Sequence, residues 1–422
     1  MLWQKVNRRQ FLRRSAGAAM GATLTAASFS RAAGANDRIG VGFIGCGGRG
    51  SAHMNYVNQL KQAGEAVELV AVSDLYRRRL DAAARRTGVK AYSDHRELLA
   101  EAKVDVVCIA TPDHHHGYQV IDAVRAGKDV YCEKPITHWR QFELTKKMAH
   151  EVRKHKRIVQ VGTQGMSDMA WHQAAELVKE GAIGQPIHAE CGYFRIGDWG
   201  ERGMPIDDPN VKPGPDLNWE AFLADSPKRP FSVSRFFRWR MYWDYAGGPS
   251  TDLFPHSLTP VVHILGVGFP STVVATGGKF RYEEREVPDT FNMLIDYPEK
   301  ITVAVLGTQG NDYQGAGSRG SPGRGPVIRG WEGTITFEGT NIIVVRPQPG
   351  VERKERQVAI KSGESVIEHW RNFLKCCRTR EKPWSPIEDL GYHVQTALQM
   401  GILSLREKTA ARFDREKEEI VL

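Results

Sequence analysis

The sequence predicts an α/β protein with a doubly wound parallel sheet in its N-terminal part, followed by an α+β domain. Its 422 residues, 41% hydrophobic and 25% charged, suit a soluble globular chain with two cores. Strand-like and helix-compatible stretches alternate over residues 36–158, as in parallel sheets. The first strand ends in a glycine-rich turn. We therefore expect a leader at 1–35, the first domain at 36–158 and the second at 159–422.

The leader has the three-part organisation of an export signal. A basic start is followed by a small-residue apolar run over about 15–30, and the Ala-Gly-Ala sequence at 33–35 offers a cleavage site. Arg8 and Arg9, with a Phe-Leu pair close behind, resemble a twin-arginine signal, which the export machinery reads. The apolar run is too short to span a bilayer, and no Cys follows it for lipid attachment. We expect a periplasmic or otherwise exported protein without a stable membrane anchor.

The formal net charge of +9 raises the question of a nucleic-acid partner. The leader contains no acidic residue, and subtracting its six basic residues from +9 leaves +3 on the rest of the chain. Because this remainder is small, we expect no nucleic-acid binding. The alternative interpretation of the leader is a disordered basic tail. Its six basic residues are Lys5, Arg8, Arg9, Arg13, Arg14 and Arg31.

Residues 38–63 have the pattern of a dinucleotide-binding turn. The apolar stretch 38–44 is typical of a buried strand, and a G-x-G-x-x-G sequence at 45–50 leads into a helix-compatible stretch. Such glycines let the backbone approach a pyrophosphate, and the helix N-terminus favours its negative charge. The alternative is a glycine turn without a ligand. The candidate cofactor-binding residues here are Gly45, Gly47, Gly48, Arg49 and Gly50.

The second expected strand, 67–73, ends at Asp74. An acid at this position commonly binds the adenosine ribose hydroxyls and repels a 2′-phosphate, which favours NAD over NADP. Arg77, Arg78 and Arg79 follow closely, and one of them could pair with a phosphate, so NADP stays possible.

The third strand, 104–110, is followed by a turn at 111–113 and by His114, His115 and His116. We expect a helix over about 117–126, His116 close to the nicotinamide or the substrate, and the other two histidines on the surface. Adjacent histidines cannot easily converge on one ion, and the six cysteines have no metal-ligand spacing, so we expect no metal. Twin-arginine cargo folds in a reducing compartment, so we also expect no structural disulfide.

The short strand 129–132 leads into Glu133, Lys134 and Pro135. A lysine at a strand tip, held by a following proline, is well placed to face a cofactor. It can act as an acid–base group or donate a hydrogen bond to a substrate hydroxyl. The alternative is an ordinary solvated loop lysine.

These motifs together resemble the Gfo/Idh/MocA family of nicotinamide-dependent oxidoreductases. The glycine turn, Asp74, Thr111-Pro112-Asp113-x-x-His116 and Glu133-Lys134-Pro135 occur in order, followed by Gly162-Thr163-Gln164 and a D-Y-A-G-G-P-S-T-D-L-F-P-H sequence at 244–256. The resemblance implies a Rossmann domain and a C-terminal domain with a large, open, mostly antiparallel sheet. It also implies a homo-oligomer, dimer or tetramer, formed through that sheet.

The resemblance implies Lys134, Asp252 and His256 as the catalytic residues. Asp252 and His256 are four residues apart, which places them on one face of a helix. His256 would take the hydroxyl proton, Lys134 would steady the charge on oxygen, and Asp252 would orient the substrate or the imidazole. The alternative is a capped helix with a core histidine. The wider candidate set is Thr111, Pro112, His116, Glu133, Lys134 and Gln164 for the cofactor, and Lys134, Arg240, Asp252 and His256 for the substrate.

The rest of the second domain matches the pattern less closely. Residues 193–245 form a loop-rich insert whose aromatic and Arg side chains suit a sugar or, for most of them, simply pack the insert. The Gly-rich segment 310–330 is expected to be a mobile loop or an oligomer contact. The expected strands are 272–276, 290–296, 301–306 and 334–337, and the expected helices are 365–378 and 387–406.

The leading functional hypothesis is an exported oxidoreductase acting on a hydroxyl or keto group of a sugar, glycoside or polyol. Free NAD is not expected outside the cytoplasmic membrane, so the cofactor would be loaded before export and held tightly. The second hypothesis is a redox-neutral glycoside hydrolase or lyase that oxidises a ring hydroxyl transiently. The third is a sugar-binding protein without activity.

Overall fold

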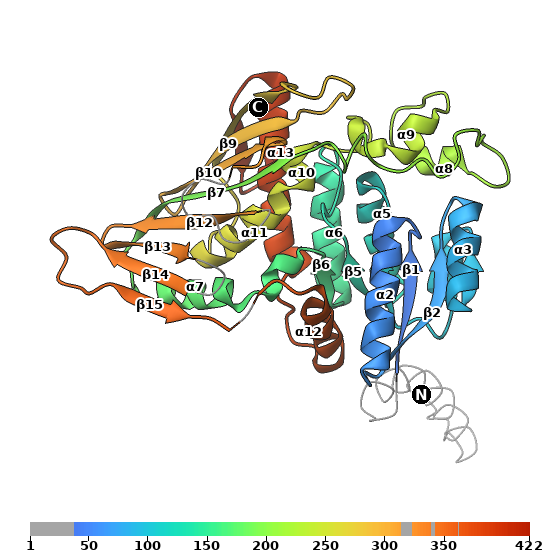
Figure 1. Ribbon diagram of the computed structural model, residues 1–422, viewed down its shortest axis with the longest axis horizontal. Helices are drawn as coiled ribbons and strands as arrows, with labels where there is room; N and C mark the ends of the chain where they lie inside the picture. The colour runs from blue at the N-terminus through green and yellow to red at the C-terminus, as the bar shows by residue number, and fades with distance from the viewer. Residues whose placement is uncertain (1–37, 314–322, 339–341, 362) are drawn as a thin grey trace, which may run out of the picture.

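The computed structural model describes residues 38–313, 323–338, 342–361 and 363–422, which form two sheets with their helices (Figure 1). The expected leader and its twin-arginine sequence lie outside these residues. The chain runs first through a parallel sheet and then through a larger, mostly antiparallel one, which confirms the predicted fold class.

The first sheet has six parallel strands in the order β3-β2-β1-β4-β5-β6. The chain starts in the centre at β1 and builds outward in both directions, which is the doubly wound arrangement. Its last strand begins at Val159, so this strand belongs to the first sheet although it lies just after the boundary that we expected at residue 158. The strands are β1 (Ile39–Ile44), β2 (Val67–Ser73), β3 (Lys90–Tyr92), β4 (Val106–Ile109), β5 (Asp129–Cys132) and β6 (Val159–Val161).

Both faces of this sheet are covered by helices. The helices α4 (His95–Ala100), α5 (Asp113–Arg125) and α6 (Phe142–His155) pack on one face. On the other face lie α2 (Gly48–Gln62), α3 (Arg77–Thr87) and the C-terminal helix α12 (Val366–Thr379). The Trp370 ring of α12 stacks on Tyr131 of β5 with centroids 4.5 Å apart. The C-terminal region therefore completes the core of the first domain.

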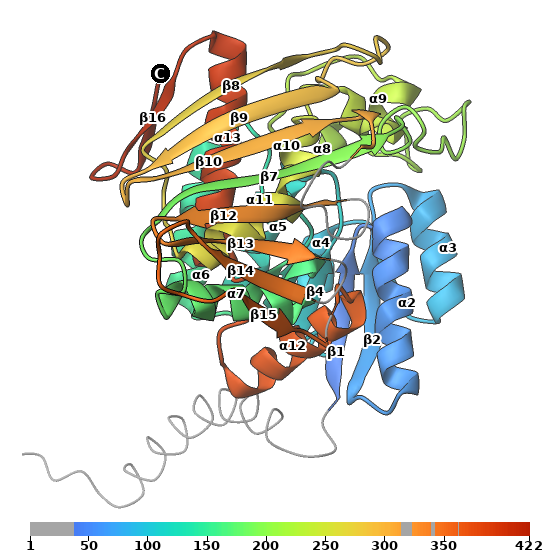
Figure 2. The ribbon, with the colours of Figure 1, turned by 60° about the vertical axis from the view of Figure 1, so that its left-hand side comes forward.

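The second sheet has eleven strands and is open, and Figure 2 shows it face on. Its strands pair antiparallel except for β10 with β7. The four strands predicted from the sequence are confirmed. The strands are β7 (Pro186–Ile196), β8 (Thr272–Gly278), β9 (Thr290–Tyr297), β10 (Ile301–Thr308), β11 (Gly310–Asn311), β12 (Gly323–Gly330), β13 (Gly333–Glu338), β14 (Ile342–Pro347), β15 (Arg356–Ala359), β16 (Ala411–Asp414) and β17 (Glu419–Val421).

The prediction of a loop over 310–330 is wrong for residues 310–311, which form β11, and for residues 323–330. Residues 323–330 form β12, which pairs with β7 and β13 inside the sheet, because ladder hydrogen bonds compensate for the low strand propensity of glycine. Residues 314–322 lie outside the described residues.

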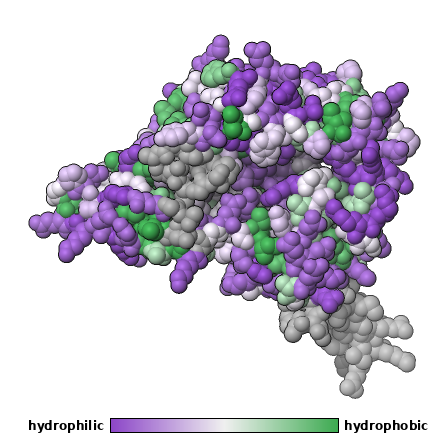
Figure 3. Space-filling model, viewed as in Figure 1, coloured by the Kyte–Doolittle hydropathy of each residue, from purple (hydrophilic) through white to green (hydrophobic). Residues whose placement is uncertain are grey.

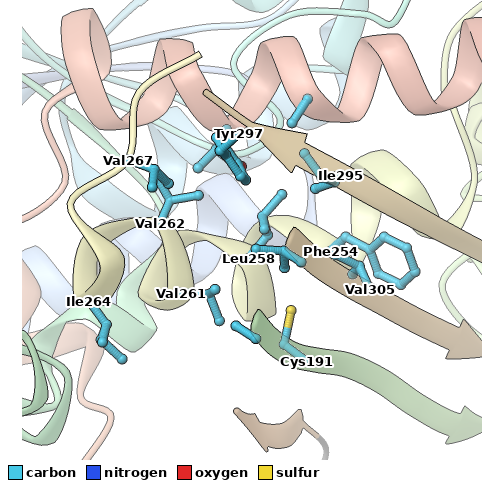
Figure 4. Close-up of a cluster of buried hydrophobic side chains, with 14 of the residues drawn as sticks. Cys191, Phe254, Leu258, Val261, Val262, Ile264, Val267, Ile295, Tyr297 and Val305 are labelled. Carbon is cyan, nitrogen blue, oxygen red and sulfur yellow. The ribbon is translucent and has the colours of Figure 1, made fainter. Parts of the chain in front are cut away.

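Three helices cover one face of the large sheet: α7 (Met169–Lys179), α11 (Phe254–Leu265) and α13 (Tyr392–Glu407). Figure 4 shows α11 side chains such as Leu258 and Val261 beside Cys191 and Val305 of the strands. The two predicted C-terminal helices are confirmed as α12 and as the π-helical turn η3 (Ile387–Gly391) with α13.

The insert between β7 and α10 (Pro249–Asp252) lies above α3 and α5 in Figure 1. It contains α8 (Trp219–Leu223), α9 (Val233–Phe237) and the 3-10 turn η2 (Trp239–Met241). Most of its aromatic side chains pack together in a small core that includes Trp219, Phe222 and Tyr245, as predicted for most of them. Trp199 is the exception, with 66% of its surface exposed.

The face seen in Figure 3 is mainly polar, and the cysteines lie in the interior. The face in Figure 3 is mainly hydrophilic, with hydrophobic residues in small separate groups. Among the described residues we find no helix of the length and hydrophobicity that crossing a membrane requires. All six cysteines are buried free thiols.

Candidate active site

The glycine turn has the tight geometry that the sequence predicts. Gly45 has φ +95°, a region that L side chains rarely adopt. A Cβ on Gly50 would lie 1.9 Å from the Gly45 carbonyl oxygen, so only glycine fits there. The helix α2 begins at Gly48, inside the motif and three residues earlier than expected. A Cβ on Gly48 would meet nothing within 4 Å, which leaves open space at the helix N-terminus.

Asp74 follows β2 and is held beside this turn. Its Oδ2 accepts a hydrogen bond from the Cys46 amide at 2.7 Å, and its Oδ1 accepts one from the Tyr76 amide at 2.8 Å. Burial raises its pKa, and the charge of Arg79 and the two amides act in the opposite direction. Each carboxylate oxygen can accept one further hydrogen bond. Asp74 can therefore bind ribose hydroxyls while it fixes the turn.

The three histidines lie in the first turns of α5, which begins at Asp113 rather than near residue 117. The prediction that His114 and His115 are surface residues is wrong. Both are buried, and each has its Nε2 within 3 Å of the Phe222 carbonyl oxygen of the insert, at 2.6 and 2.9 Å. No local sequence pattern indicates that the insert covers this helix.

His116 connects the two turns that surround the expected nicotinamide position. Its Nδ1 lies 2.6 Å from the Pro135 carbonyl oxygen and its Nε2 lies 2.8 Å from the Thr111 carbonyl oxygen. Burial lowers the pKa of His116. A neutral imidazole carries a single N–H, so His116 donates a hydrogen bond to one of these two carbonyl oxygens and contacts the other.

A cavity of about 1320 Å³ runs along the carboxyl edge of the parallel sheet. Gly45, Asp74, Thr111 and Lys134 line it from the first domain, and the insert lines its opposite wall. Other lining residues from the predicted set are Gly47, Gly48, Arg49, Pro112, His116, Glu133 and Arg240. Its volume exceeds what a single small ligand needs.

Lys134 stands at one end of this cavity and joins the two domains. Its Nζ donates hydrogen bonds to Oδ1 of Asp252 at 2.8 Å and to the Asp252 carbonyl oxygen at 2.6 Å. The structure therefore brings together two of the three predicted catalytic residues, although 118 positions separate them in the sequence.

Asp252 ends α10 and is surrounded by cations. Besides Lys134, Nε of Arg240 lies 3.3 Å from its Oδ1 and an Nη of Arg195 lies 3.9 Å from its Oδ2. Burial by itself raises the pKa of Asp252, but the charges of Lys134, Arg240 and Arg195 outweigh it and hold the pKa far below its ordinary value. Asp252 is thus a permanent carboxylate that positions the Lys134 ammonium.

His256 lies in the first turn of α11, directly after the break at Leu253 that separates α10 from α11. Burial, and then the charge of Lys134, lower its pKa to about 3, so the imidazole is neutral at pH 7. Its ring centroid is 6.2 Å from that of Tyr193. Among the described residues that line the cavity, neither Asp252 nor His256 is found.

The arrangement fits a dinucleotide. The open space at Gly48 leaves room for a pyrophosphate, and the free acceptor positions on Asp74 suit the adenosine ribose. The cavity continues far enough along the sheet edge to hold the nicotinamide as well. Two models of protein families also match, one described as an NAD-binding Rossmann fold over residues 39–163 and one as a C-terminal alpha/beta domain over 168–422. The chain belongs to the Gfo/Idh/MocA oxidoreductase family.

Curated relatives in this family include inositol 2-dehydrogenases. That of Rubrobacter xylanophilus is 34% identical over 155 residues, which are 36% of this chain and 43% of that protein. That of Burkholderia cenocepacia is 30% identical over 183 residues, 42% of this chain and 53% of that protein. The matches thus span about half the length of these relatives.

Solved structures of the family share the fold across nearly the whole chain. An NAD-binding oxidoreductase from Klebsiella pneumoniae aligns with TM-score 0.66 and 20% identity, covering 89% of this chain and 98% of that one. Levoglucosan dehydrogenase in complex with NADH and levoglucosan aligns with TM-score 0.66 and 22% identity, covering 89% and 99%.

Three further family-motif residues bind one another behind the glycine turn. Nε of Arg49 donates to Oε1 of the buried Glu133 at 2.7 Å, and its Nη2 donates to Oε1 of Gln164 at 3.3 Å. The same Glu133 oxygen lies 2.7 Å from Nε2 of His53, a buried residue that the sequence reasoning missed. Burial by itself would raise the pKa of Glu133. The charge of Arg49 and the hydrogen bond with His53 outweigh burial, and the pKa of Glu133 is held well below its ordinary value. Arg49 is thus held at the cavity wall.

Sequence reasoning also missed Arg195 and Glu201, which lie behind Asp252. Both are buried, and their side chains are 3.4 Å apart. Burial raises the pKa of Glu201 to about 7. Arg195 was visible in the sequence as part of the expected loop-rich insert 193–245, but its pairing was not. Among the described residues, no group of three His, Cys, Asp or Glu side chains could hold a metal ion.

Proposed function

We propose that this protein is an NAD(H)-dependent oxidoreductase acting on a secondary hydroxyl or keto group of a sugar, glycoside or polyol. The observation that carries the proposal is the position of Lys134. It lies at the end of the cavity that begins at the glycine turn, and Asp252 holds its ammonium by two hydrogen bonds.

The hydrogen bonds of Lys134 define what it can do. An ammonium has three donors, and two of them are directed at Asp252. The third is available for a substrate oxygen in the cavity. In alcohol oxidation this donor stabilises the negative charge that grows on the oxygen as the proton leaves. In ketone reduction it polarises the carbonyl.

A bound nicotinamide supplies the two-electron acceptor for oxidation and the donor for reduction. From the family resemblance we assign the proton of the substrate hydroxyl to His256, whose imidazole is neutral at pH 7 and close enough to Lys134 and Asp252 for both charges to act on its pKa, although it is not among the described residues that line the cavity. Its low pKa favours release of this proton to solvent afterwards. Arg240 lines the cavity beside Lys134 and would bind further substrate oxygens.

The sugar or polyol substrate class is supported by relatives. Inositol 2-dehydrogenases and levoglucosan dehydrogenase carry polyol and sugar names. The charges at Lys134, Arg240 and Asp252 suit a ligand rich in hydroxyl groups. That this chain itself acts on a sugar or polyol is our proposal.

Tight cofactor binding and export also belong to the proposal. The insert covers the cavity opposite the glycine turn, and its Phe222 carbonyl oxygen lies within hydrogen-bonding distance of His114 and His115. A dinucleotide between these walls would contact both domains. Such a two-sided site suits a protein that is loaded with cofactor before export through its twin-arginine leader. Replacing Arg8 and Arg9 by Lys should retain the protein in the cytoplasm, which cell fractionation would detect.

A homo-oligomer formed through the large sheet completes the proposal. Val274 and Leu294 face each other on β8 and β9 and are 41% and 55% exposed, an apolar pair on the outer side of the sheet. Replacing Leu294 by Glu should reduce the mass measured by light scattering.

The decisive experiment uses the purified mature protein. Bound dinucleotide is extracted and identified, and a panel including myo-inositol, levoglucosan and aryl glycosides is tested for reduced nicotinamide and for released aglycone. A keto product with cofactor reduction supports the proposal. Aglycone release without net reduction would instead indicate the redox-neutral hydrolase, and sugar binding without turnover would indicate a binding protein. Absence of any bound or binding dinucleotide would overturn the proposal.

A further inference from the structure

We infer that Asp207, in the insert of the second domain, makes the cofactor site selective for NAD(H) over NADP(H). The inference rests on the proposed function in one respect, namely that the cavity binds a dinucleotide. It concerns the corner after β2, where Asp74 is placed to bind the adenosine ribose.

The insert is attached to this corner by its backbone. Tyr76 and Leu217 form an antiparallel bridge. The Arg77 amide donates to the Asp216 carbonyl oxygen at 2.8 Å, and the Asn218 amide donates to the Leu75 carbonyl oxygen at 3.3 Å. The corner that follows Asp74 is therefore shared by both domains rather than exposed to solvent.

Arg79 is a cation close to the expected ribose position. It lines the cavity together with Asp74, and a Cβ on Gly47 would lie 3.3 Å from its Nη1. Its Nε donates to Oδ2 of Asp207 at 2.6 Å, and both side chains are about a quarter exposed, at 28% and 26%. Asp207 therefore holds this guanidinium from the side of the insert.

The other two arginines of the run are not among the described residues that line the cavity. Arg77 lies 3.5 Å from Asp81 on the outer side of α3, with 63% of its side chain exposed. Arg78 donates to the Asp207 carbonyl oxygen at 2.8 Å. Arg79 is thus the member of the run that can face a ligand at the glycine turn.

A 2′-phosphate would bring close to two negative charges into this corner. With Asp207 present, the corner holds two carboxylates, Asp74 and Asp207, and Arg79 is already paired with one of them. A 2′-hydroxyl meets no such repulsion. Without Asp207, the guanidinium would be free to form charge-assisted hydrogen bonds with the phosphate.

The test uses the mature protein after its dinucleotide has been removed. It is incubated with equal concentrations of NADH and NADPH, unbound nucleotide is removed, and the bound fraction is released by denaturation and quantified by chromatography. Wild type should retain mainly NADH. In Asp207→Ala the bound NADPH:NADH ratio should rise about tenfold or more, since a hydrogen bond between charged groups is gained.

Arg79→Ala is the matched control, because it breaks the same ion pair but leaves no cation. Its NADPH:NADH ratio should not rise. Asp207→Asn keeps the shape and an oxygen acceptor, so it should fold even if the alanine variant does not, and it should raise the ratio by a smaller factor. An unchanged ratio in both Asp207 variants, or an equal rise in Arg79→Ala, would overturn the inference. Wild type that binds neither nucleotide would overturn the proposed function itself.

Discussion

The two ends of the cavity are built by different physical means. At the dinucleotide end, residues 45–50 and Asp74 belong to one βαβ unit, and backbone geometry and steric limits fix them. At the substrate end, Lys134 meets Asp252 across a domain interface, and mutual attraction of buried charges holds them. The stability of the first end should therefore respond more to changes of volume than to changes of charge. The second end should respond in the opposite way.

The largest expected effect is at the substrate end. Lys134→Ala removes the donor that we propose to stabilise charge on the substrate oxygen, so it should lower kcat by about 1000-fold. Dinucleotide affinity should change only slightly, because Asp252 keeps Arg240 and Arg195 as partners. Steady-state kinetics and NADH titration measure both quantities. Lys90→Ala, an exposed lysine paired with Glu101, is the control. More than a tenth of wild-type turnover in Lys134→Ala would contradict the assignment.

The second prediction concerns volume at the dinucleotide end. Gly50→Ala places a Cβ 1.9 Å from a carbonyl oxygen and should lower the free energy of unfolding by about 2 kcal/mol or more. Gly48→Ala meets nothing within 4 Å, so it should leave unfolding unchanged in the apoprotein but weaken NADH binding. Urea unfolding and fluorescence titration separate the two effects. Equal losses of stability in both variants would show that steric contact does not determine the stability of the dinucleotide end.

A third prediction tests the buried charges through pH. Burial raises the pKa of Glu201 from 4.5 to about 7. Between these values the unfolded chain releases a proton that the folded protein keeps, so the free energy of unfolding falls as pH rises and then stays constant above pH 7. Glu201→Gln cannot lose this proton. Between pH 4.5 and 8, its urea stability should fall by about 3 kcal/mol less than that of wild type.

The control for this comparison is Glu220→Gln, which makes the same charge change on a side chain that is 87% exposed. Its pH dependence should match that of wild type. If Glu201→Gln also matched wild type, the buried network would not control stability in this range.

The smallest expected effect is at the exposed edge of the dinucleotide end. Arg77→Ala removes a surface pair with Asp81 and should change the free energy of unfolding by less than about 0.5 kcal/mol. It should also leave the NADPH:NADH binding ratio unchanged. A shift in that ratio as large as the one expected for Asp207→Ala would mean that the arginine run acts as a whole rather than through Arg79.

The dinucleotide end could be predicted from the sequence because its parts are close together in the chain. A strand, a glycine turn, a helix and an acid at the next strand end define one compact unit, and the steric need for glycine leaves a direct trace at 45–50. The expected strands and the C-terminal helices could also be predicted, since their apolar periodicity follows from the sheet faces that they cover.

Other features depended on contacts that no local pattern contains. The burial of His114 and His115 is caused by the insert, more than 100 residues later, and a run of histidines is otherwise typical of a polar surface. The strand β12 was expected to be a loop because its glycines have low strand propensity, yet pairing with β7 decides its structure.

By itself, the sequence determined the doubly wound sheet and the dinucleotide turn, because local sterics specify them, and its family motifs predicted Lys134, Asp252 and His256 as catalytic residues. Only the tertiary structure decided which charges meet. It placed Arg195 and Glu201 behind Asp252, and Asp207 against Arg79. Coulomb energies depend on distance and burial rather than on sequence separation, so such partners become visible only when the domains are packed together.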